Sequence, residues 1–329
     1  MTPRRISRHS AALGTAAWIA WQFLADPSVT LVLLGLSPLV LIPLVLSAAL
    51  DEAEGSRRLV GLSWAQLPCA LALVFGLWLA PGWPAAVACV PWAAWTAVSA
   101  FEGLVRVRGL LARGGLRGLV AAGSDGGGEL AVAAGLGFPL VGSAWLLADR
   151  LELMPLGFSP LFVILTAIHF HHAGFTLPMT AGLLARSSTP GPWSRVGALV
   201  VVAVPLTAIG ITASPLLEWI GAWMTAAAGI AAGVGLLLRA RTLAMLPALL
   251  SAGSGACLLA GMVFAGAYAL GEYFGVAFPD IASMIQLHGA VNALGFGLLG
   301  AWAWHLSPPP GPSPTPTPTP APTSESTDA

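Results

Sequence analysis

The sequence contains no lysine and few charged residues of any kind. Only 9% of its 329 residues are charged, whereas 57% are hydrophobic, and the mean hydropathy is +0.83. A soluble globular domain carries about 25% charged residues, so this chain has too few charges to cover a surface that faces water. We therefore expect an integral membrane protein whose main surroundings are the lipid bilayer.

Two further absences exclude other classes of protein. The formal net charge is zero, and the basic patch expected of a nucleic-acid-binding chain is missing, so we expect no nucleic-acid partner. Cysteine is also scarce, and Cys69, Cys89 and Cys257 lie in separate apolar stretches without a CxxC pair. This spacing is typical of small packing residues and not of a disulfide framework or a zinc site.

Long apolar runs dominate the sequence, and a helix needs about 20 apolar residues to cross a bilayer. Breaks that contain proline, glycine or charged residues separate the runs. The predicted spans are residues 11–25, 28–50, 63–81, 84–105, 129–148, 158–185, 196–213, 217–238, 244–270 and 282–305. The sequence thus predicts an all-α, polytopic integral membrane helical bundle of about ten transmembrane helices over residues 1–306.

The two ends of the sequence differ from this pattern. Residues 307–329 are rich in proline and threonine, which predicts an extended, polyproline-II-like disordered tail. At the other end, three arginines precede the run 11–25, as they do in a signal peptide. A second apolar run begins at Ser28 without a convincing cleavage site between the two, so we expect a retained first helix.

The arginines predict the orientation of the bundle. With a cytoplasmic N-terminus and ten spans, 13 of the 14 arginines fall in cytoplasmic segments and only Arg150 lies outside. We expect a multi-pass protein of the bacterial cytoplasmic (inner) membrane with both termini in the cytoplasm. Glu102 and Arg106 have the spacing of an i,i+4 ion pair at the inner end of their span.

Ionisable side chains inside a membrane are costly and therefore indicate functional sites. The sixth predicted span contains His169, His171 and His172 near the bilayer midplane. His169 and His172 are three residues apart and share one helical face, which Thr176 extends, whereas His171 points elsewhere.

The tenth predicted span carries a second polar face. Asp280, Met284, His288 and Asn292 follow one another at intervals of four residues, so a single face presents a carboxylate, an imidazole and an amide. The sixth and tenth spans run in the same direction in the ten-span arrangement. We therefore expect His169 and His288 at comparable depth.

The ninth predicted span brings Tyr268 and Glu272 to the same outer level.

Three interpretations of these polar residues are open. In the first, the histidines are interhelical hydrogen-bond partners that hold the bundle together. In the second, they form an acid–base site, because neutral imidazole moves protons readily and a desolvated carboxyl group with a raised pKa acts as a general acid. In the third, His169, His172 and His288 bind a metal or haem, although the HExxH pattern is missing.

Two stretches, HFHHAGFTLP at residues 169–178 and LHGAVNALGF at residues 287–296, resemble the YndJ-like family of bacterial multipass membrane proteins. The resemblance covers under a tenth of the chain, and the Pro-Thr tail departs from the family. It implies that the family's shared motifs include His169, His171, His172, His288 and Asn292. The family is commonly labelled transporter-like, without a mechanism that carries over to this chain.

We predict an enzyme that performs acid–base chemistry, by isomerisation, cyclisation or hydrolytic opening, on a small hydrophobic substrate. The alternative is a transporter of a small or amphiphilic molecule in which the same histidines couple protons or contact the substrate. No cofactor is expected, with a metal or haem on three histidines as the minority alternative. The predicted catalytic residues are His169, His172, His288, Asp280 and Glu272, and the predicted substrate-binding residues are Asn292, His171, Tyr268 and Thr176.

Overall fold

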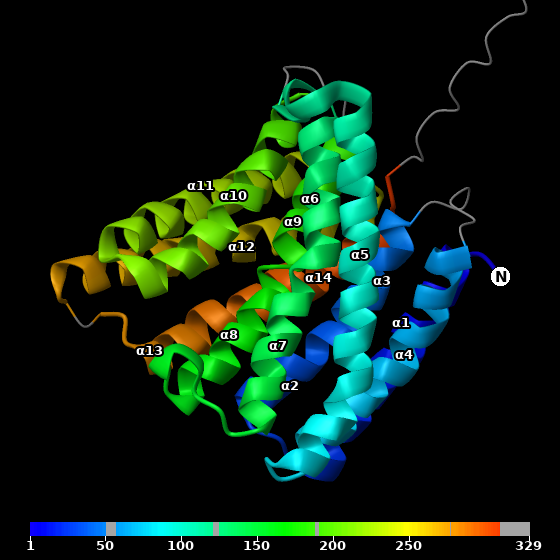
Figure 1. The fold of residues 1–329 in the computed structure, drawn as a ribbon. Helices are drawn as coiled ribbons and strands as arrows, with labels where there is room; N and C mark the ends of the chain where they lie inside the picture. The colour runs from blue at the N-terminus through cyan, green and yellow to red at the C-terminus, as the bar shows by residue number, and fades with distance from the viewer. Residues whose placement is uncertain (51–56, 121–124, 188–190, 277, 310–329) are drawn as a thin grey trace, which may run out of the picture.

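The computed structural model describes residues 1–50, 57–120, 125–187, 191–276 and 278–309. All regular secondary structure in these ranges is helical, and the helices pack as a bundle (Figure 1). Within the same ranges, nine helical segments are long and apolar enough to cross a membrane, and α1 (Pro3–Ala25) is a tenth helix of spanning length. The predicted all-α membrane bundle of about ten helices is confirmed.

The nine segments overlap, one by one, the predicted runs from 28–50 to 282–305. In chain order they consist of α2 (Val29–Leu36), η1 (Ser37–Leu41) and α3 (Ile42–Ala49); α4 (Arg57–Trp78); α5 (Trp83–Val120); α6 (Gly126–Gly137) and α7 (Pro139–Arg150); α8 (Pro160–His172) and α9 (Thr176–Ser187); α10 (Pro192–Ala213); α11 (Pro215–Ala240); α12 (Met245–Phe274); and α13 (Ile281–Ser283), η3 (Met284–Gly289), η4 (Val291–Leu298) and α14 (Leu299–Leu306). A single short turn, η2 (Pro155–Gly157), connects α7 to α8.

The first helix is longer than the predicted run 11–25. It begins at Pro3, where the side chain of Thr2 caps the first turn, so the arginines near the N-terminus belong to the helix and do not precede it. The helix packs directly on the second segment. A Cβ atom at Gly14 would lie 1.9 Å from the carbonyl oxygen of Leu39, so only glycine permits this approach.

The segment Val29–Ala49 is the core of the bundle. Every residue from 33 to 50 is buried, and the segment contacts α1, α4, α8, α9 and α14. A helix that is apolar on all sides is typical of such a central position. Around it, α10, α11 and α12 lie together on one side of the bundle and α1, α4 and α5 on another (Figure 1).

Hydrogen bonds to backbone carbonyls connect the core segment to its neighbours. The Gln66 side-chain amide donates to the Pro38 carbonyl oxygen at 2.6 Å, and the Ser37 hydroxyl donates to the His171 carbonyl oxygen at 2.6 Å. Interhelical bonds of this kind add to the packing energy that holds membrane helices together. The second of them fixes the end of α8 against η1.

Arginines of five helices gather at one end of the bundle. They lie beside polar groups of that end and are Arg4, Arg8, Arg58, Arg106, Arg113, Arg186 and Arg239. Arg150 lies at the opposite end, where its carbonyl oxygen accepts a hydrogen bond from the Gly82 N–H. The predicted pair of Glu102 and Arg106 is confirmed at 3.7 Å. The cytoplasmic location of the arginine-rich end stays a prediction.

The predicted boundary at residue 306 coincides with the last residue of α14. Residues 310–329 of the predicted tail lie outside the described part of the chain, so the conformation of the tail also stays a prediction.

Candidate functional site

Helix α8 ends in three histidines whose surroundings differ. An α-helix turns by about 100° per residue, so His169 and His172 project from one side of α8 and His171 from another. The His169 side chain is exposed, His172 is half-buried and His171 is fully buried. The three imidazoles therefore differ in how much of each ring another molecule can reach.

His171 is held by the protein through both ring nitrogens. Its Nδ1 atom lies 2.8 Å from the Ala167 carbonyl oxygen, to which it donates, and its Nε2 atom accepts a hydrogen bond from the Trp92 indole N–H at 2.9 Å. The Trp92 ring is also fully buried and stacks on Trp95, with ring centroids 4.9 Å apart. Both ring nitrogens of His171 are thus engaged by groups of the protein itself, and the predicted substrate contact of this residue stays a prediction.

His169 and His288 lie side by side although they come from different segments. Their rings stack, with centroids 6.5 Å apart and ring planes inclined by 23°. The Nδ1 atom of His169 lies 2.8 Å from the Leu165 carbonyl oxygen, and that of His288 lies 2.9 Å from the Gly261 carbonyl oxygen. A carbonyl oxygen only accepts hydrogen bonds. Each ring therefore carries its proton on Nδ1 and presents Nε2 as a base.

The residues around His288 belong to a distorted helix. His288 lies in η3 and Asn292 in η4, and both elements are π-helical. The amide nitrogen of Asn292 lies 3.2 Å from Nδ1 and 3.5 Å from Nε2 of His288. Because Nδ1 carries a proton, the amide N–H can donate only to Nε2. π-Helical turns are rare and are frequent at functional sites. The close contact with α12 also depends on Gly261, where a Cβ atom would lie 2.4 Å from the Asn292 amide.

His172 is only half satisfied. Its Nε2–H donates to the Leu33 carbonyl oxygen of α2 at 2.7 Å, whereas its buried Nδ1 atom has no hydrogen-bond partner. The hydroxyl oxygen of Thr176, on the same predicted face, is likewise buried without a partner. The Asn292 side-chain oxygen is also buried without a hydrogen-bond partner.

The predicted carboxylates form a separate group. Tyr268, Glu272 and Asp280 line a pocket of about 340 Å³ at the end of α12, next to the start of α13. Asp280 precedes His288 by eight residues, which corresponds to about 12 Å along a helix. The structure therefore joins His169 with His288 and joins Tyr268 with the two carboxylates, but it does not merge the two groups into one constellation.

The carboxyl group of Asp280 has the opposite property to the one predicted. It caps α13 by accepting a hydrogen bond from the Ser283 backbone N–H at 2.7 Å. This bond, together with one from the Ser283 side chain, holds the pKa of Asp280 below its ordinary value. The position of Asp280 at the exposed start of a helix therefore favours the ionised form, and its predicted catalytic role stays a prediction.

The minority metal site is not assembled in the described part of the chain. No group of three His, Cys, Asp or Glu side chains among those residues is arranged to hold a metal ion.

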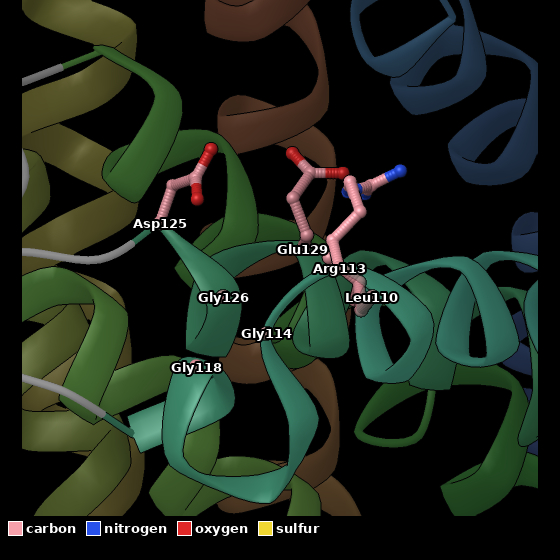
Figure 2. Close-up of a pocket in the computed structure, with 7 residues that line it drawn as sticks. All are labelled: Leu110, Arg113, Gly114, Gly118, Asp125, Gly126 and Glu129. Carbon is pink, nitrogen blue, oxygen red and sulfur yellow. The ribbon is translucent and has the colours of Figure 1, made fainter.

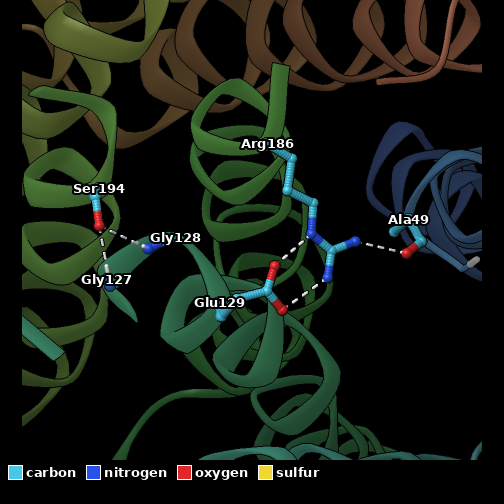
Figure 3. Close-up of polar contacts among 6 residues, drawn as sticks. All are labelled: Ala49, Gly127, Gly128, Glu129, Arg186 and Ser194. Atoms are coloured by element: carbon cyan, nitrogen blue, oxygen red, sulfur yellow. Dashed lines mark hydrogen bonds and ion pairs between the residues drawn. The ribbon is translucent and has the colours of Figure 1, made fainter. Parts of the chain in front are cut away.

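At the arginine-rich end, Arg186 connects three segments. Its guanidinium group binds the Glu129 carboxylate through two bonds of 2.5 and 2.8 Å and donates to the Ala49 carbonyl oxygen at 2.7 Å (Figure 3). Beside this clamp, the Ser194 hydroxyl oxygen accepts hydrogen bonds from two glycine N–H groups at the start of α6. Charge-assisted, two-pronged pairs of this kind are strong and directional, so they lock α6, α9 and α3 together.

A second pocket lies beside this clamp. It measures about 220 Å³, and Arg113 and Glu129 lie next to one another in its wall (Figure 2). The charged residues that line the pocket are Arg113, Asp125 and Glu129, and Glu129 is already paired with Arg186. The pocket therefore offers less unused chemistry than the histidine pair does.

Sequence reasoning missed the groups that orient the histidines. The carbonyl oxygens of Leu33 and Gly261 have no sequence signal, because every residue carries a carbonyl group. Trp92 did have a signal. It lies in the middle of the run 84–105, whereas interfacial tryptophans lie near the ends of spans.

Comparison with known proteins assigns the chain to a family. Residues 32–296 match the model of the YndJ-like protein family, and both histidine stretches lie within the match. Over 180 residues, or 54% of this chain, the sequence is 31% identical to the "Uncharacterized membrane protein YndJ" of Bacillus subtilis (strain 168). That match spans 33% of the relative's length. No solved structure matches. The chain is a multipass membrane protein that belongs to the YndJ-like family.

Proposed function

We propose that this protein is a membrane-embedded enzyme that performs acid–base chemistry on a hydrophobic substrate, with His169 and His288 as the proton-transfer pair. The stacked arrangement of these two rings is the observation that carries the proposal. Imidazole donates and accepts protons near neutral pH. Two such rings at one place supply an acid and a base to the same substrate.

The hydrogen bonds of the pair support this division of work. Each ring keeps its Nδ1–H directed at a backbone carbonyl, which leaves Nε2 as the atom that gains and loses a proton. When one ring is protonated at Nε2 and the other is not, the pair removes a proton at one position and returns a proton at another. An isomerisation or cyclisation then needs no further reactant, whereas a hydrolytic opening consumes water.

The surroundings of the pair support a hydrophobic substrate. His169 is the tenth residue of the spanning segment Pro160–Ser187 and lies about 14 Å along the helix from its start, near the middle of a hydrocarbon core of about 30 Å. Leu287, next to His288, is 45% exposed. A substrate that reaches an exposed imidazole at this depth has to cross or enter apolar surroundings.

A transporter is the second candidate, and one observation favours it. Helices α8 and α9 are separated by a break at residues 173–175. Discontinuous helices near the membrane midplane form the binding sites of many secondary transporters. In this reading the histidine pair couples the movement of protons to that of the transported molecule.

One experiment separates the two functions. The purified protein in detergent is incubated with a lipid extract, and a change in any lipid is measured by mass spectrometry. In parallel, proteoliposomes loaded with a pH-sensitive dye report proton movement when the same extract is added. An enzyme changes a lipid in detergent, where no gradient exists, whereas a proton-coupled transporter changes no lipid and moves protons only across the closed membrane.

A further inference from the structure

Helix α5 is longer than a membrane span requires. It starts at Trp83, at the end of the bundle where the Gly82 N–H meets the Arg150 carbonyl oxygen, and it continues to Gly115, where the backbone leaves the helical conformation. These 33 residues extend over about 50 Å, whereas the hydrocarbon core of a bilayer is about 30 Å thick. The core therefore ends about 20 residues after Trp83, near residue 103. The rest of the helix lies at the level of the lipid headgroups and beyond them.

The part of α5 beyond residue 103 is strongly basic. It contains four arginines, and the sequence has no acidic residue between Glu102 and Asp125. Arg106 pairs with Glu102 at 3.7 Å. The other three arginines are exposed, and together they are called the basic cluster: Arg108, Arg113 and Arg117.

The carboxylates in the pocket beside the basic cluster do not neutralise it. Arg113 shares the wall of this pocket with Asp125 and Glu129, where α5 meets the start of α6 (Figure 2). Glu129 already binds Arg186 through both carboxylate oxygens, which leaves Asp125 for the cluster. One carboxylate balances one of three guanidinium groups, so the pocket leaves the cluster with an excess of positive charge.

The basic cluster reaches the lipid-facing side of α5. Four exposed side chains of α5 follow one another at intervals of three or four residues, so they share one helical face. They are Phe101, Leu104, Arg108 and Leu111. Another face packs on α6, where Gly103 leaves no room for a Cβ atom. Exposed apolar side chains of a membrane helix face the lipid, so Arg108 lies next to lipid at the level of the headgroups.

Arg58 of α4 adds a cation to the same side. Its guanidinium carbon lies 5.6 Å from the centroid of the exposed Phe101 ring, and its side chain is half exposed. Glu102 lies 3.8 Å from Arg58 and 3.7 Å from Arg106, so one carboxylate serves two guanidinium groups. The positive charge at the inner end of this lipid-facing strip therefore also exceeds the negative charge.

These charges and positions select the chemistry of a ligand. A guanidinium group binds a phosphate group through two parallel hydrogen bonds, and basic residues at a membrane surface attract anionic lipids. A soluble acidic partner would not explain why Arg108 stands in one row with lipid-facing side chains. We infer that Arg108, Arg113 and Arg117 bind the phosphate groups of anionic phospholipids. The inference does not depend on the proposed function, because none of these arginines belongs to the histidine pair.

The test compares two lipids that have the same acyl chains. Dioleoyl phosphatidylglycerol and dioleoyl phosphatidylcholine are added in equal amounts to the full-length protein in detergent, and bound lipid is measured by native mass spectrometry. The choline ammonium group balances the phosphate charge of the second lipid. We expect phosphatidylglycerol to bind in about tenfold excess, because each basic residue near an anionic headgroup adds to the attraction. Equal binding of the two lipids overturns the inference.

Two triple variants locate the preference. Replacement of the three arginines of the basic cluster by glutamine should remove most of the preference for phosphatidylglycerol. The matched control replaces three exposed arginines of the same end of the bundle that lie outside α5, and it changes the net charge by the same amount. These control positions are Arg5, Arg195 and Arg241. The control should keep the preference. If both variants lose it equally, the net charge of this end selects the lipid and the inference is wrong.

A third variant separates the loss of charge from the loss of structure. Lysine at the three positions of the basic cluster keeps the charge but not the fork of the guanidinium group, so it should retain most of the preference. The lysine and glutamine variants should unfold at the same temperature in detergent, because the replaced side chains are exposed. A lysine variant that binds the two lipids equally would contradict a site that acts through its charge.

Discussion

The imidazole rings of His169 and His288 lie with their centroids 6.5 Å apart, and each holds its Nδ1–H on a backbone carbonyl. The two carbonyls belong to different helices, Leu165 on α8 and Gly261 on α12. The pair is thus fixed from both sides, and three helical segments have to be in place before the rings meet. This dependence on the assembled bundle makes the pair accessible to mutational tests.

Removal of either imidazole of the pair should abolish lipid modification without unfolding the protein. We expect His169→Ala and His288→Ala to lower the rate by about 100-fold or more, because general acid–base groups contribute about 10²–10⁴. The rate is measured by mass spectrometry of the product, and folding by thermal unfolding in detergent. His9→Ala, which removes an exposed histidine of α1, is the matched control. A rate unchanged in both pair variants would contradict the proton-transfer role.

The contact between Trp92 and His171 should contribute to stability. Trp92→Phe leaves Nε2 of a fully buried imidazole without its donor, and we expect a loss of about 1–3 kcal/mol. Trp78→Phe, at a side chain 60% exposed, is the control and should change the unfolding temperature little. Combining Trp92→Phe with His171→Leu removes both partners and should restore part of the loss. A Trp92 variant as stable as the control would show that this bond is not needed.

The glycines at the start of α6 should not tolerate a methyl group. A Cβ atom at Gly127 would lie 2.1 Å from the Ser194 carbonyl oxygen, and overpacking of this kind costs about 1–3 kcal/mol. Gly61→Ala, where nothing lies within 4 Å, is the control and should raise stability slightly, because alanine favours helix. Thermal unfolding of the two variants should therefore shift in opposite directions. Equal shifts would contradict the close packing of α6 on α10.

The ion pair between Arg186 and Glu129 should stabilise the arginine-rich end. Glu129→Gln removes the charge from a two-pronged bond, and we expect a loss of about 1.5–3 kcal/mol. Arg113→Gln, at an exposed side chain in the same pocket wall, should change stability by less than about 0.5 kcal/mol. Both values come from urea-induced unfolding in detergent. Similar losses in the two variants would mean that Arg186 is not the main partner of Glu129.

The orientation in the membrane is testable by labelling. A cysteine is added to the native sequence at Leu153, in the connection between α7 and η2, or at Thr242, between α11 and α12, and the two positions lie at opposite ends of the bundle. If the arginine-rich end is cytoplasmic, a membrane-impermeant thiol reagent labels Leu153→Cys on intact cells and labels Thr242→Cys only after permeabilisation. The unaltered protein, with its three native cysteines, gives the background. The reverse pattern would invert the orientation.

The course of the chain was predictable because hydrophobicity alone determines which residues cross a bilayer. The run 28–50 and the segment Val29–Ala49 differ by only one residue at each end. The start of α1 was predicted too late, because arginines near the N-terminus lowered the apolar character of residues that are nevertheless helical. Amino-acid composition predicts which residues lie in the lipid, but it does not predict where a helix begins outside the lipid.

The candidate site was predictable only in part. The shared direction of two spans correctly suggested that His169 and His288 lie at similar depth. The regular spacing from Asp280 to His288, by contrast, suggested one continuous polar face, whereas Asp280 caps a helix at the surface and His288 lies in a π-helix. The partners of each ring are backbone groups brought together by packing, and no residue type in the sequence encodes them.

The central position of Val29–Ala49 has a consequence for how the protein is made. This segment is synthesised before two of the helices that enclose it, α9 and α14. Until then its sides face lipid, which costs little because the segment is apolar on all sides. Insertion and assembly are therefore separate steps, and the histidine pair forms only after the segment that contains His288 has been synthesised.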